Sequence, residues 1–411
     1  MHRTITPTQR FRRYGVISLL NAFSLGIFVP IMSLMLLDKG LDLSTLAFTL
    51  GAYSLVVVLA EVPSGFASDK FGRKHCFNLA KALSIIGMIL LIGNASLLRM
   101  VLALLSLALS RAFISGSFEA LCVDQYLEAY GKDRLSRISM MLSLWETIGL
   151  SAGALASGAV VLLSRYLPQG YGRYDANLLA SVTVNILVLA LSLGWIQENL
   201  NPGVTHRESF SIAATFRTIR ENRKLLPLFI SAGATGFMLC TVETYWQPRF
   251  LQVTENPTLI ALIGVLAFLG FFGAMGGNLI SGRVLDRKPS QVMGWYIGSR
   301  LLLAATIGFL AFMGGIVTYS MAYAAVYVAL GMANIAENVM MNRETASQVR
   351  ASILSISSFS LQSGALVASG VGGLLLRSVQ GSIQLVWIIA AAVVIISVIP
   401  FIRGTKKKEL L

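Results

Sequence analysis

The chain has 411 residues, of which 55% are hydrophobic and 13% are charged, and its mean hydropathy is +0.72. A soluble domain of this length carries roughly 25% charged residues, so the composition excludes an ordinary water-soluble globular protein. The formal net charge of +14 is spread over short segments between apolar runs, which argues against one continuous nucleic-acid-binding face.

Apolar runs of about twenty residues divide the whole chain, and a helix of this length crosses a hydrocarbon core about 30 Å thick. Each run is predicted to be an α-helix, because no water is available inside a bilayer to satisfy the backbone groups. The first run follows a basic stretch and is too long for a secretory signal, so it counts as a span. The twelve predicted spans are residues 14–36, 44–66, 76–95, 98–122, 137–164, 176–197, 225–248, 258–281, 291–313, 316–340, 351–376 and 383–403.

An even number of spans places both termini on the same side of the membrane. Lys and Arg residues gather at the two termini and in the even-numbered loops, which predicts that both ends are cytoplasmic in a bacterial plasma membrane. Inside the spans, the bases are taken to be Arg111 and Arg300. The odd-numbered loops hold few cations, namely Lys39, Arg99, Arg165, Arg173, Arg249 and Arg377.

The most distinctive segment, residues 65–74, joins the second and third spans and is predicted to be a loop. It reads Gly-Phe-Ala-Ser-Asp-Lys-Phe-Gly-Arg-Lys. A weaker copy, residues 282–288, lies between the eighth and ninth spans and reads Gly-Arg-Val-Leu-Asp-Arg-Lys. Duplicated charged segments in an otherwise apolar chain indicate a membrane transporter built from two related halves.

The longest polar stretch lies midway along the chain and ends at Lys224. Its apolar and basic residues alternate in a way that predicts a linker with an amphipathic helix on the anionic inner leaflet, and a solvated connector is the alternative. The sequence therefore predicts an all-α membrane protein with twelve spans in two pseudo-symmetric halves. Residues 1–198 form the N-terminal half, residues 199–224 the cytoplasmic linker and residues 225–411 the C-terminal half.

The segment after the second span resembles the signature of the major facilitator superfamily, Gly-x-x-x-Asp-(Arg/Lys)-x-Gly-Arg-(Arg/Lys). The span count, the central linker and the second copy extend the resemblance over the whole chain, although Pro289 and Ser290 replace the Gly-Arg end in that copy. The resemblance implies two six-helix bundles and alternating access at a central cavity. The matching positions are Gly65, Asp69, Lys70, Gly72, Arg73 and Lys74.

The charges of this segment predict a latch on the cytoplasmic side. Asp69 is expected to approach the N-terminus of the eleventh span, near residues 350–355, where free N–H groups favour an anion. Arg73 is expected to pair with Asp124 at the inner end of the fourth span, and Asp286 is the acid of the second copy. Partly buried contacts of this kind are worth about 1–3 kcal/mol. The alternative is a simple positive-inside anchor, which needs neither Asp69 nor the glycines.

The fifth span resembles the glycine-rich fifth span of the exporters in this superfamily. Gly149, Gly153 and Gly158 keep three glycines, whereas Ala154 and Ser157 replace a proline and a glycine. Ordinary close helix packing, which also favours small residues, is the alternative. A similar stretch, residues 363–370, recurs in the eleventh span.

Ionisable side chains inside spans are candidates for function, because each costs several kcal/mol unless it is paired or hydrated. Arg111 resembles an arginine in the fourth span of many family members, although Gly116 follows one position too late. Arg300 is expected to neutralise an acid on a neighbouring helix. The acids outnumber the bases, which suits proton carriage or a cationic substrate. They are Glu61, Glu119, Glu146, Glu243 and Glu337.

Depth and spacing rank these candidates. Arg111 is predicted near the midplane and Glu119 two turns further on the same face, so these two are expected to share a cavity. Glu146, about ten residues into the fifth span, is ranked separately as a cavity acid. Glu61 and Glu337 are predicted near the inner ends as gate residues, whereas Glu243 is predicted to lie in an interfacial aromatic belt. Further contacts to a substrate are expected from Trp145, Tyr126 and Gln362.

The favoured function is a proton-coupled antiporter that exports small amphipathic or cationic compounds, resembling the twelve-helix drug/proton antiporters. An uptake carrier for a polar metabolite is the first alternative, with contacts from Asn21, Gln125, Asn185, Asn334 and Gln362, and a lipid or glycolipid flippase is the second. A sensor is disfavoured because no long soluble domain exists.

No catalytic constellation, nucleotide-binding loop, metal-ligand spacing or cofactor motif is present in the sequence, so no enzymatic activity is expected. The expected partners are a small-molecule substrate, protons and the lipid bilayer, without nucleic acid. The protein is expected to act as a monomer.

Overall fold

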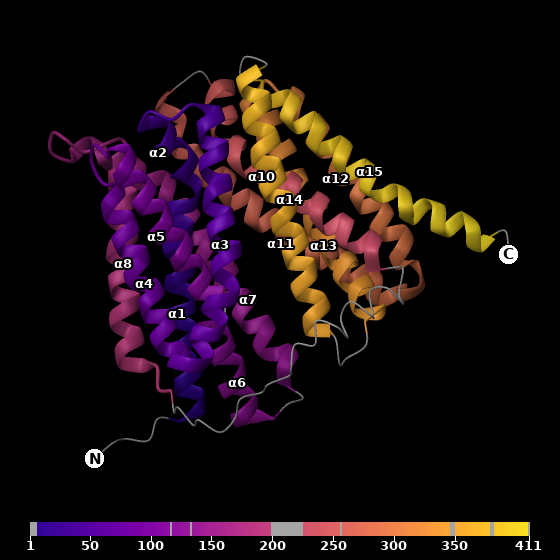
Figure 1. The fold of residues 1–411 in the computed structure, drawn as a ribbon, viewed down its shortest axis with the longest axis horizontal. Helices are drawn as coiled ribbons and strands as arrows, with labels where there is room; N and C mark the ends of the chain where they lie inside the picture. Colours follow the sequence, from indigo (N-terminus) through magenta and orange to yellow (C-terminus); the bar gives the residue numbers. More distant parts are fainter. Residues whose placement is uncertain are drawn as a thin grey trace. The chain divides into compact units, whose positions relative to one another are not determined.

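The structure, a computed structural model, describes residues 6–115, 117–131, 134–198, 225–254, 257–345, 350–378 and 382–409. These residues are almost entirely helical and contain no β-strand (Figure 1). They include 12 helical segments long and apolar enough to cross a membrane, as predicted. The predicted all-α fold class is therefore confirmed, and the helices satisfy their own backbone groups as a bilayer requires.

The helices of the first half are α1 (Pro7–Phe28), α2 (Met32–Asp38), α3 (Leu43–Phe71), α4 (Arg73–Leu91), α5 (Leu97–Ser115), α6 (Phe118–Tyr130), α7 (Leu135–Val160) and α8 (Asp175–Trp195). Those of the second half are α10 (Leu225–Thr254), α11 (Leu262–Arg287), α12 (Val292–Phe312), α13 (Ile316–Arg343), α14 (Arg350–Ser378) and α15 (Ile383–Glu409). Short 3-10 helices extend several of them: η1 (Val29–Ile31), η3 (Val161–Tyr166), η4 (Pro257–Ala261) and η5 (Pro289–Gln291).

Both halves use the same helix packing. In the first half, α1 packs on α7 and α8, and α4 packs on α5 and α8. In the second half, α10 packs on α14 and α15, and α12 packs on α13 and α15. When the spans are numbered from the start of each half, the same pairs pack together in both halves. The first span packs on the fifth and sixth, and the third packs on the fourth and sixth. The duplication inferred from the charged segments therefore extends to the bundle architecture.

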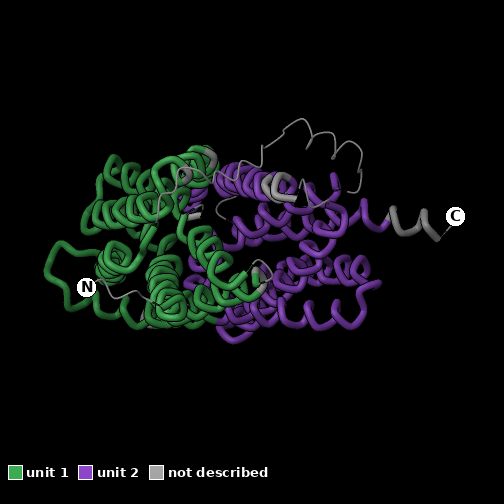
Figure 2. The backbone as a smooth tube through the Cα atoms, turned by 90° about the horizontal axis from the view of Figure 1, so that it is seen from below, with its two compact units in different colours: residues 1–40, 53–205, 258–268 green, residues 41–52, 206–257, 269–411 purple. Residues whose placement is uncertain are grey.

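The described residues belong to two compact units (Figure 2). Unit 1 comprises residues 1–40, 53–205 and 258–268, and unit 2 comprises residues 41–52, 206–257 and 269–411. Each unit thus includes the first turns of one helix from the other half of the sequence. In unit 2, the Ser44 hydroxyl of α3 donates to the Gly373 carbonyl of α14 at 2.8 Å. In unit 1, Gly264 of α11 lies so close to α7 that a Cβ would overlap the Ala154 carbonyl.

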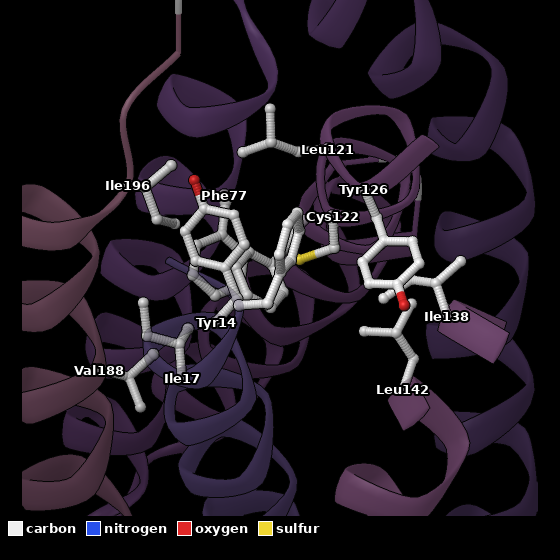
Figure 3. Packing of buried hydrophobic residues seen from close by; sticks show 12 residues of the cluster. Tyr14, Ile17, Phe77, Leu121, Cys122, Tyr126, Ile138, Leu142, Val188 and Ile196 are labelled. Carbon is white, nitrogen blue, oxygen red and sulfur yellow. The ribbon is translucent and has the colours of Figure 1, made fainter. Parts of the chain in front are cut away.

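Aromatic side chains fill the end of unit 1 at which α1 begins. Figure 3 shows this cluster, in which Tyr14 and Phe77 lie beside Cys122. The rings of Phe77 and Phe118 stack at 4.8 Å, and Phe11 meets Tyr126 edge-on at 4.9 Å. Such ring pairs add about 0.5–1.5 kcal/mol beyond the burial of their surface. The cluster therefore ties α1, α4 and α6 together.

The charged segment at residues 65–74 is not the loop that was predicted. Helix α3 continues through Phe71 and α4 begins at Arg73, so Gly72 alone separates them. Gly72 has φ of +94°, which a glycine adopts without the steric cost that other residues incur. The second copy is likewise helical, because α11 continues to Arg287. The prediction was wrong because the helices extend beyond the apolar runs from which it was made.

Candidate functional site

The predicted pair between Arg73 and Asp124 is present. The Arg73 guanidinium of α4 donates to the Asp124 carboxylate of α6 at 2.5 Å. The Asp124 side chain is 64% exposed, so water screens the attraction. Exposed pairs contribute about 0.2–1 kcal/mol, which is below the range predicted from a partly buried contact.

A residue that sequence reasoning missed, Glu198, anchors the same segment. Its carboxylate accepts from the backbone N–H of Arg73 at 2.8 Å and from that of Lys74 at 2.9 Å, so it caps the N-terminus of α4. In return, the Lys74 ammonium donates to the carbonyls of Leu193 and Ile196 at the end of α8, at 3.0 and 2.6 Å. Anions stabilise helix N-termini and cations stabilise C-termini, so these two helix ends cap each other.

The other members of the charged segment have fewer described contacts. Asp69 lies in the last turns of α3. Its side chain and those of residues 350–352 lie outside the described residues, so its predicted approach to the N-terminus of the eleventh span stays a prediction. The predicted linker at 199–224 also lies outside the described residues. Lys70 is exposed, with its ammonium 5.3 Å from the centre of the Phe71 ring. A Cβ at Gly65 would meet no atom within 4 Å. Asp286 is exposed in the last turn of α11.

Four polar side chains come together in unit 1. Arg111 of α5 donates a hydrogen bond to the Tyr53 hydroxyl of α3. Glu146 of α7 lies within electrostatic range of both Arg111 and Glu119 of α6. Arg111, Glu119 and Glu146 are exposed in the isolated chain, and Tyr53 is half-buried. Glu146 thus lies near both Arg111 and Glu119, and the cavity expected for these side chains stays a prediction. Tyr53 was missed because an isolated tyrosine in a span gives no sequence signal.

The aromatic candidates pack on protein groups. A Cβ on Gly15 of α1 would lie 2.6 Å from the Trp145 ring, which shows how closely this ring covers α1. Tyr126 is buried, with its ring 4.9 Å from Phe11 and 4.7 Å from Tyr130. A role for either ring in stacking on a ligand remains a prediction.

Two further residues that the sequence analysis named as candidates, Glu61 and Gln362, lie in different helices. Glu61 is exposed in α3, and its backbone carbonyl accepts from the Ser64 hydroxyl at 2.9 Å. Gln362 is half-buried in α14. Their predicted roles, as a gate residue and as a substrate contact, stay predictions.

Arg300 of α12 neutralises an acid on a neighbouring helix, as predicted. Its guanidinium lies 3.8 Å from the Glu337 carboxylate of α13. It also donates to the hydroxyl of Thr235 in α10 and, at 2.8 Å, to that of Ser397 in α15. The side chain of Arg300 is fully buried and that of Glu337 is 13% exposed. This pair joins four helices of unit 2 through charge-assisted hydrogen bonds.

The prediction that Arg111 and Arg300 are the bases inside the spans was incomplete, because Lys81 lies within α4 and is only 1% exposed. Its side-chain nitrogen donates to the amide oxygens of Asn21 in α1 and Asn185 in α8. The predicted third span, residues 76–95, already contains Lys81, but its charge was counted with the neighbouring cytoplasmic loop. A fully buried position can be recognised only from the packing.

The amides proposed for substrate contacts divide into two groups. Asn21 and Asn185 are engaged with Lys81, and Gln125 joins the Tyr14 hydroxyl, at 2.8 Å, to the Gln197 carbonyl, at 2.7 Å. Asn334 is exposed in α13. Three of these amides therefore hold the first bundle together.

Glu243 of α10 lies among aromatic side chains that are buried in the protein, and its predicted place in an interfacial aromatic belt stays a prediction. It is half-buried and accepts a hydrogen bond from the Tyr327 hydroxyl of α13. The Tyr327 ring lies 4.9 Å from that of Tyr323, which lies 4.8 Å from Trp246. The carboxylate is thus built into the packing between α10 and α13.

A separate ionic contact fixes the short loops that follow α2 and α4. Asp175, at the start of α8, accepts from the backbone N–H groups of Gly93 and Gly172, each at 2.7 Å. Lys39 lies 3.8 Å from Asp175 and donates to the Gly93 carbonyl at 2.7 Å. Burial lowers the pKa of Lys39, and the charge of Asp175 opposes that shift. These contacts are structural and separate from the Arg111 group.

The sequence of this chain is similar to those of known membrane transporters. The family model described as Major Facilitator Superfamily matches residues 14–349. An uncharacterized MFS-type transporter, YxaM of Bacillus subtilis (strain 168), is 27% identical over 237 residues, and the match spans 56% of this chain and 56% of YxaM.

Solved structures share the fold at low sequence identity. The nucleoside transporter NupG superposes with a TM-score of 0.77 at 14% identity, over 97% of this chain and 99% of that one. A bacterial homologue of the human lysosomal transporter Spinster, inward-facing and unoccupied, superposes with a TM-score of 0.73 at 15% identity, over 96% and 98%.

Proposed function

Because the chain belongs to the Major Facilitator Superfamily of membrane transporters, we propose that it is a proton-coupled antiporter that exports small amphipathic, cationic compounds. The observation that carries this proposal is the group formed by Arg111, Glu119 and Glu146. These ionisable side chains share one region of unit 1, and each is exposed on a membrane-spanning segment.

The net charge of this group suits exchange. Two carboxylates and one guanidinium carry one uncompensated negative charge when both acids are ionised. Exposing such charges to lipid costs several kcal/mol each, so this face requires water or a compensating cation. Either a proton or a cationic substrate neutralises the excess charge, and the two would compete for it. Competition of this kind is the basis of antiport.

The proposal also covers the membrane location, the topology and the cytoplasmic contacts of the protein. The protein spans a bacterial plasma membrane with both termini in the cytoplasm and acts as a monomer. Residues 1–198 and 225–411 are the two bundles, and residues 199–224 link them. The pair of Arg73 and Asp124, together with Asp69, forms a cytoplasmic latch that opens during the cycle.

Transport by reconstituted protein tests the proposal. Proteoliposomes with an acidic lumen should accumulate a lipophilic cationic dye while protons leave, because the two ions exchange. Glu146→Gln and Glu119→Gln should each reduce this uptake at least tenfold without changing the amount of folded protein. The matched control is Glu128→Gln, which alters an exposed acid on α6 outside the group and should transport normally.

Other outcomes would point to the alternatives. Proton-driven accumulation of a nucleoside or sugar, without dye transport, would contradict export and favour an uptake carrier. Movement of a fluorescent lipid between leaflets, again without dye transport, would favour a flippase. Unchanged dye transport in both Gln variants would contradict the role given to the acids.

A further inference from the structure

Lys81 occupies a sealed site with two neutral acceptors. Its nitrogen donates to the Asn21 oxygen and, at 3.2 Å, to the Asn185 oxygen. The orientation of Asn185 is determined by its own amide group, which donates to the Ser24 hydroxyl at 2.7 Å and to the Ser181 carbonyl at 2.9 Å. The Asn185 oxygen must therefore face Lys81.

The helices packed around α4 present no charge to this nitrogen within the described residues. Helix α1 contributes Asn21 and α8 contributes Asn185. Helix α5 contributes Ser110, whose hydroxyl donates to the Ala80 carbonyl at 2.7 Å. The centre of the Phe77 ring lies 5.6 Å from the nitrogen, and Phe77 belongs to the aromatic cluster, whose titratable groups are Tyr14, Cys122 and Tyr126.

The second half shows what a permanent cation needs at the same place. Arg300 is the ninth residue of α12, as Lys81 is of α4, and both bond to the first and sixth spans of their halves. Arg300 has the Glu337 carboxylate at 3.8 Å in addition to its hydroxyl and carbonyl acceptors. Among the residues that the structure describes, no acid accompanies Lys81. The two positions therefore differ in counter-charge and not in location.

We propose that Lys81 is a proton-exchange site, held as the neutral amine in this conformation and protonated when the bundle opens toward Asn21. A neutral amine has two N–H donors, which match the two amide oxygens. An ammonium group has a third donor, for which the described part of the chain provides no oxygen, and an ammonium without a counter-charge costs several kcal/mol to bury. Lysine can lose its proton in such a site, whereas arginine cannot.

The proton of Lys81 is exchanged with solvent water. The ammonium releases one proton to solvent and keeps its carbon–nitrogen bond, so no other reactant is needed. Access lies on the side of Asn21, which is half-buried, whereas Asn185 is 1% exposed. The exchange is a property of unit 1 and does not depend on the proton coupling proposed for transport.

Thermal unfolding against pH tests this site without a transport assay. An unfolded lysine keeps its proton up to about pH 10. If folded Lys81 is neutral near pH 7, unfolding takes up a proton, so the melting temperature of the wild type should rise between pH 6.5 and pH 9. The melting temperature of Lys81→Met should lack this rise, so the difference in melting temperature between the two proteins should change with pH. Equal pH slopes for the two proteins would overturn the proposal.

Two further variants serve as a control and as a second test of the buried site. Lys70→Met removes an exposed lysine from the neighbouring helix end and should retain the wild-type slope. Lys81→Arg forces a permanent charge into the site and should lower the melting temperature by several degrees at every pH. A Lys81→Arg protein as stable as the wild type would show that a permanent charge is tolerated, against the proposal.

A direct reading is available if Lys81→Met does not fold. In wild-type protein labelled with ¹³C-lysine, the Cε resonance of Lys81 should take the neutral-amine position at pH 7. It is assigned by its disappearance in Lys81→Arg or Lys81→Gln. A resonance at the ammonium position would overturn the proposal even if transport proves to be proton-coupled.

Discussion

The third span of each half carries a buried base at its ninth position, and the surroundings of the two bases differ. Arg300 in unit 2 is matched by the Glu337 carboxylate, whereas Lys81 in unit 1 is held by two amides. In unit 1 the corresponding acid, Glu119, is exposed and lies near Glu146 instead. One half thus uses its acid to balance a structural cation, and the other leaves its acid available. Duplicated bundles can keep their packing and still separate structural from functional charge.

The largest expected effect comes from breaking the balanced pair. Arg300→Met would leave Glu337 buried without its counter-charge, which typically costs about 3–5 kcal/mol. The melting temperature of the purified protein should fall sharply. Adding Glu337→Gln to this variant should restore part of the loss, because the orphaned charge is then removed. An unchanged melting temperature for Arg300→Met alone would show that the pair is not structural.

The small-residue stretches of α7 and α14 offer a second comparison. A Cβ at Gly158 would overlap the Ala261 carbonyl, whereas a Cβ at Gly370, its counterpart in the repeat, meets no atom within 4 Å. Gly158→Ala should therefore cost about 1–3 kcal/mol through overpacking. Gly370→Ala should be neutral or should stabilise by up to about 1 kcal/mol, because alanine favours helices. Equal melting temperatures for the two variants would contradict this difference.

The reciprocal caps of α4 and α8 are expected to contribute less. Glu198→Ala removes the acceptor from two N–H groups at the start of α4, and losing a helix cap costs about 0.5–2 kcal/mol. Glu198→Gln retains one acceptor oxygen and should show a smaller loss. Thermal unfolding measures both, and a larger loss for the Gln variant would argue against capping as the cause.

The smallest expected effect concerns the exposed pair of the charged segment. Asp124→Asn should cost no more than about 1 kcal/mol of stability, because water screens this contact. The loss should shrink further in high salt. If Asp124→Asn instead changes cysteine accessibility on the two membrane faces, the pair acts on the conformational equilibrium as the latch proposal requires.

The spans and several contacts could be predicted because they depend on local pattern. Apolar runs of sufficient length must be helical in a bilayer, so the twelve spans followed from hydropathy. The pair of Arg73 and Asp124 followed from a signature motif, and a counter-charge for Arg300 followed from the cost of burying a cation. The charged segment was wrongly predicted as a loop, since helix ends continue into the polar region beyond the apolar runs.

Other features depended on which residues meet in space. Glu198 caps a helix whose first residue precedes it by more than a hundred positions, and no spacing rule links them. The sequence by itself determined the span number, the duplication and the inventory of charges, because hydropathy and composition belong to each segment alone. Only the tertiary structure decided that Lys81 is buried between two amides and that Glu337 is the acid beside Arg300, because burial and the choice of partner arise when distant helices pack together.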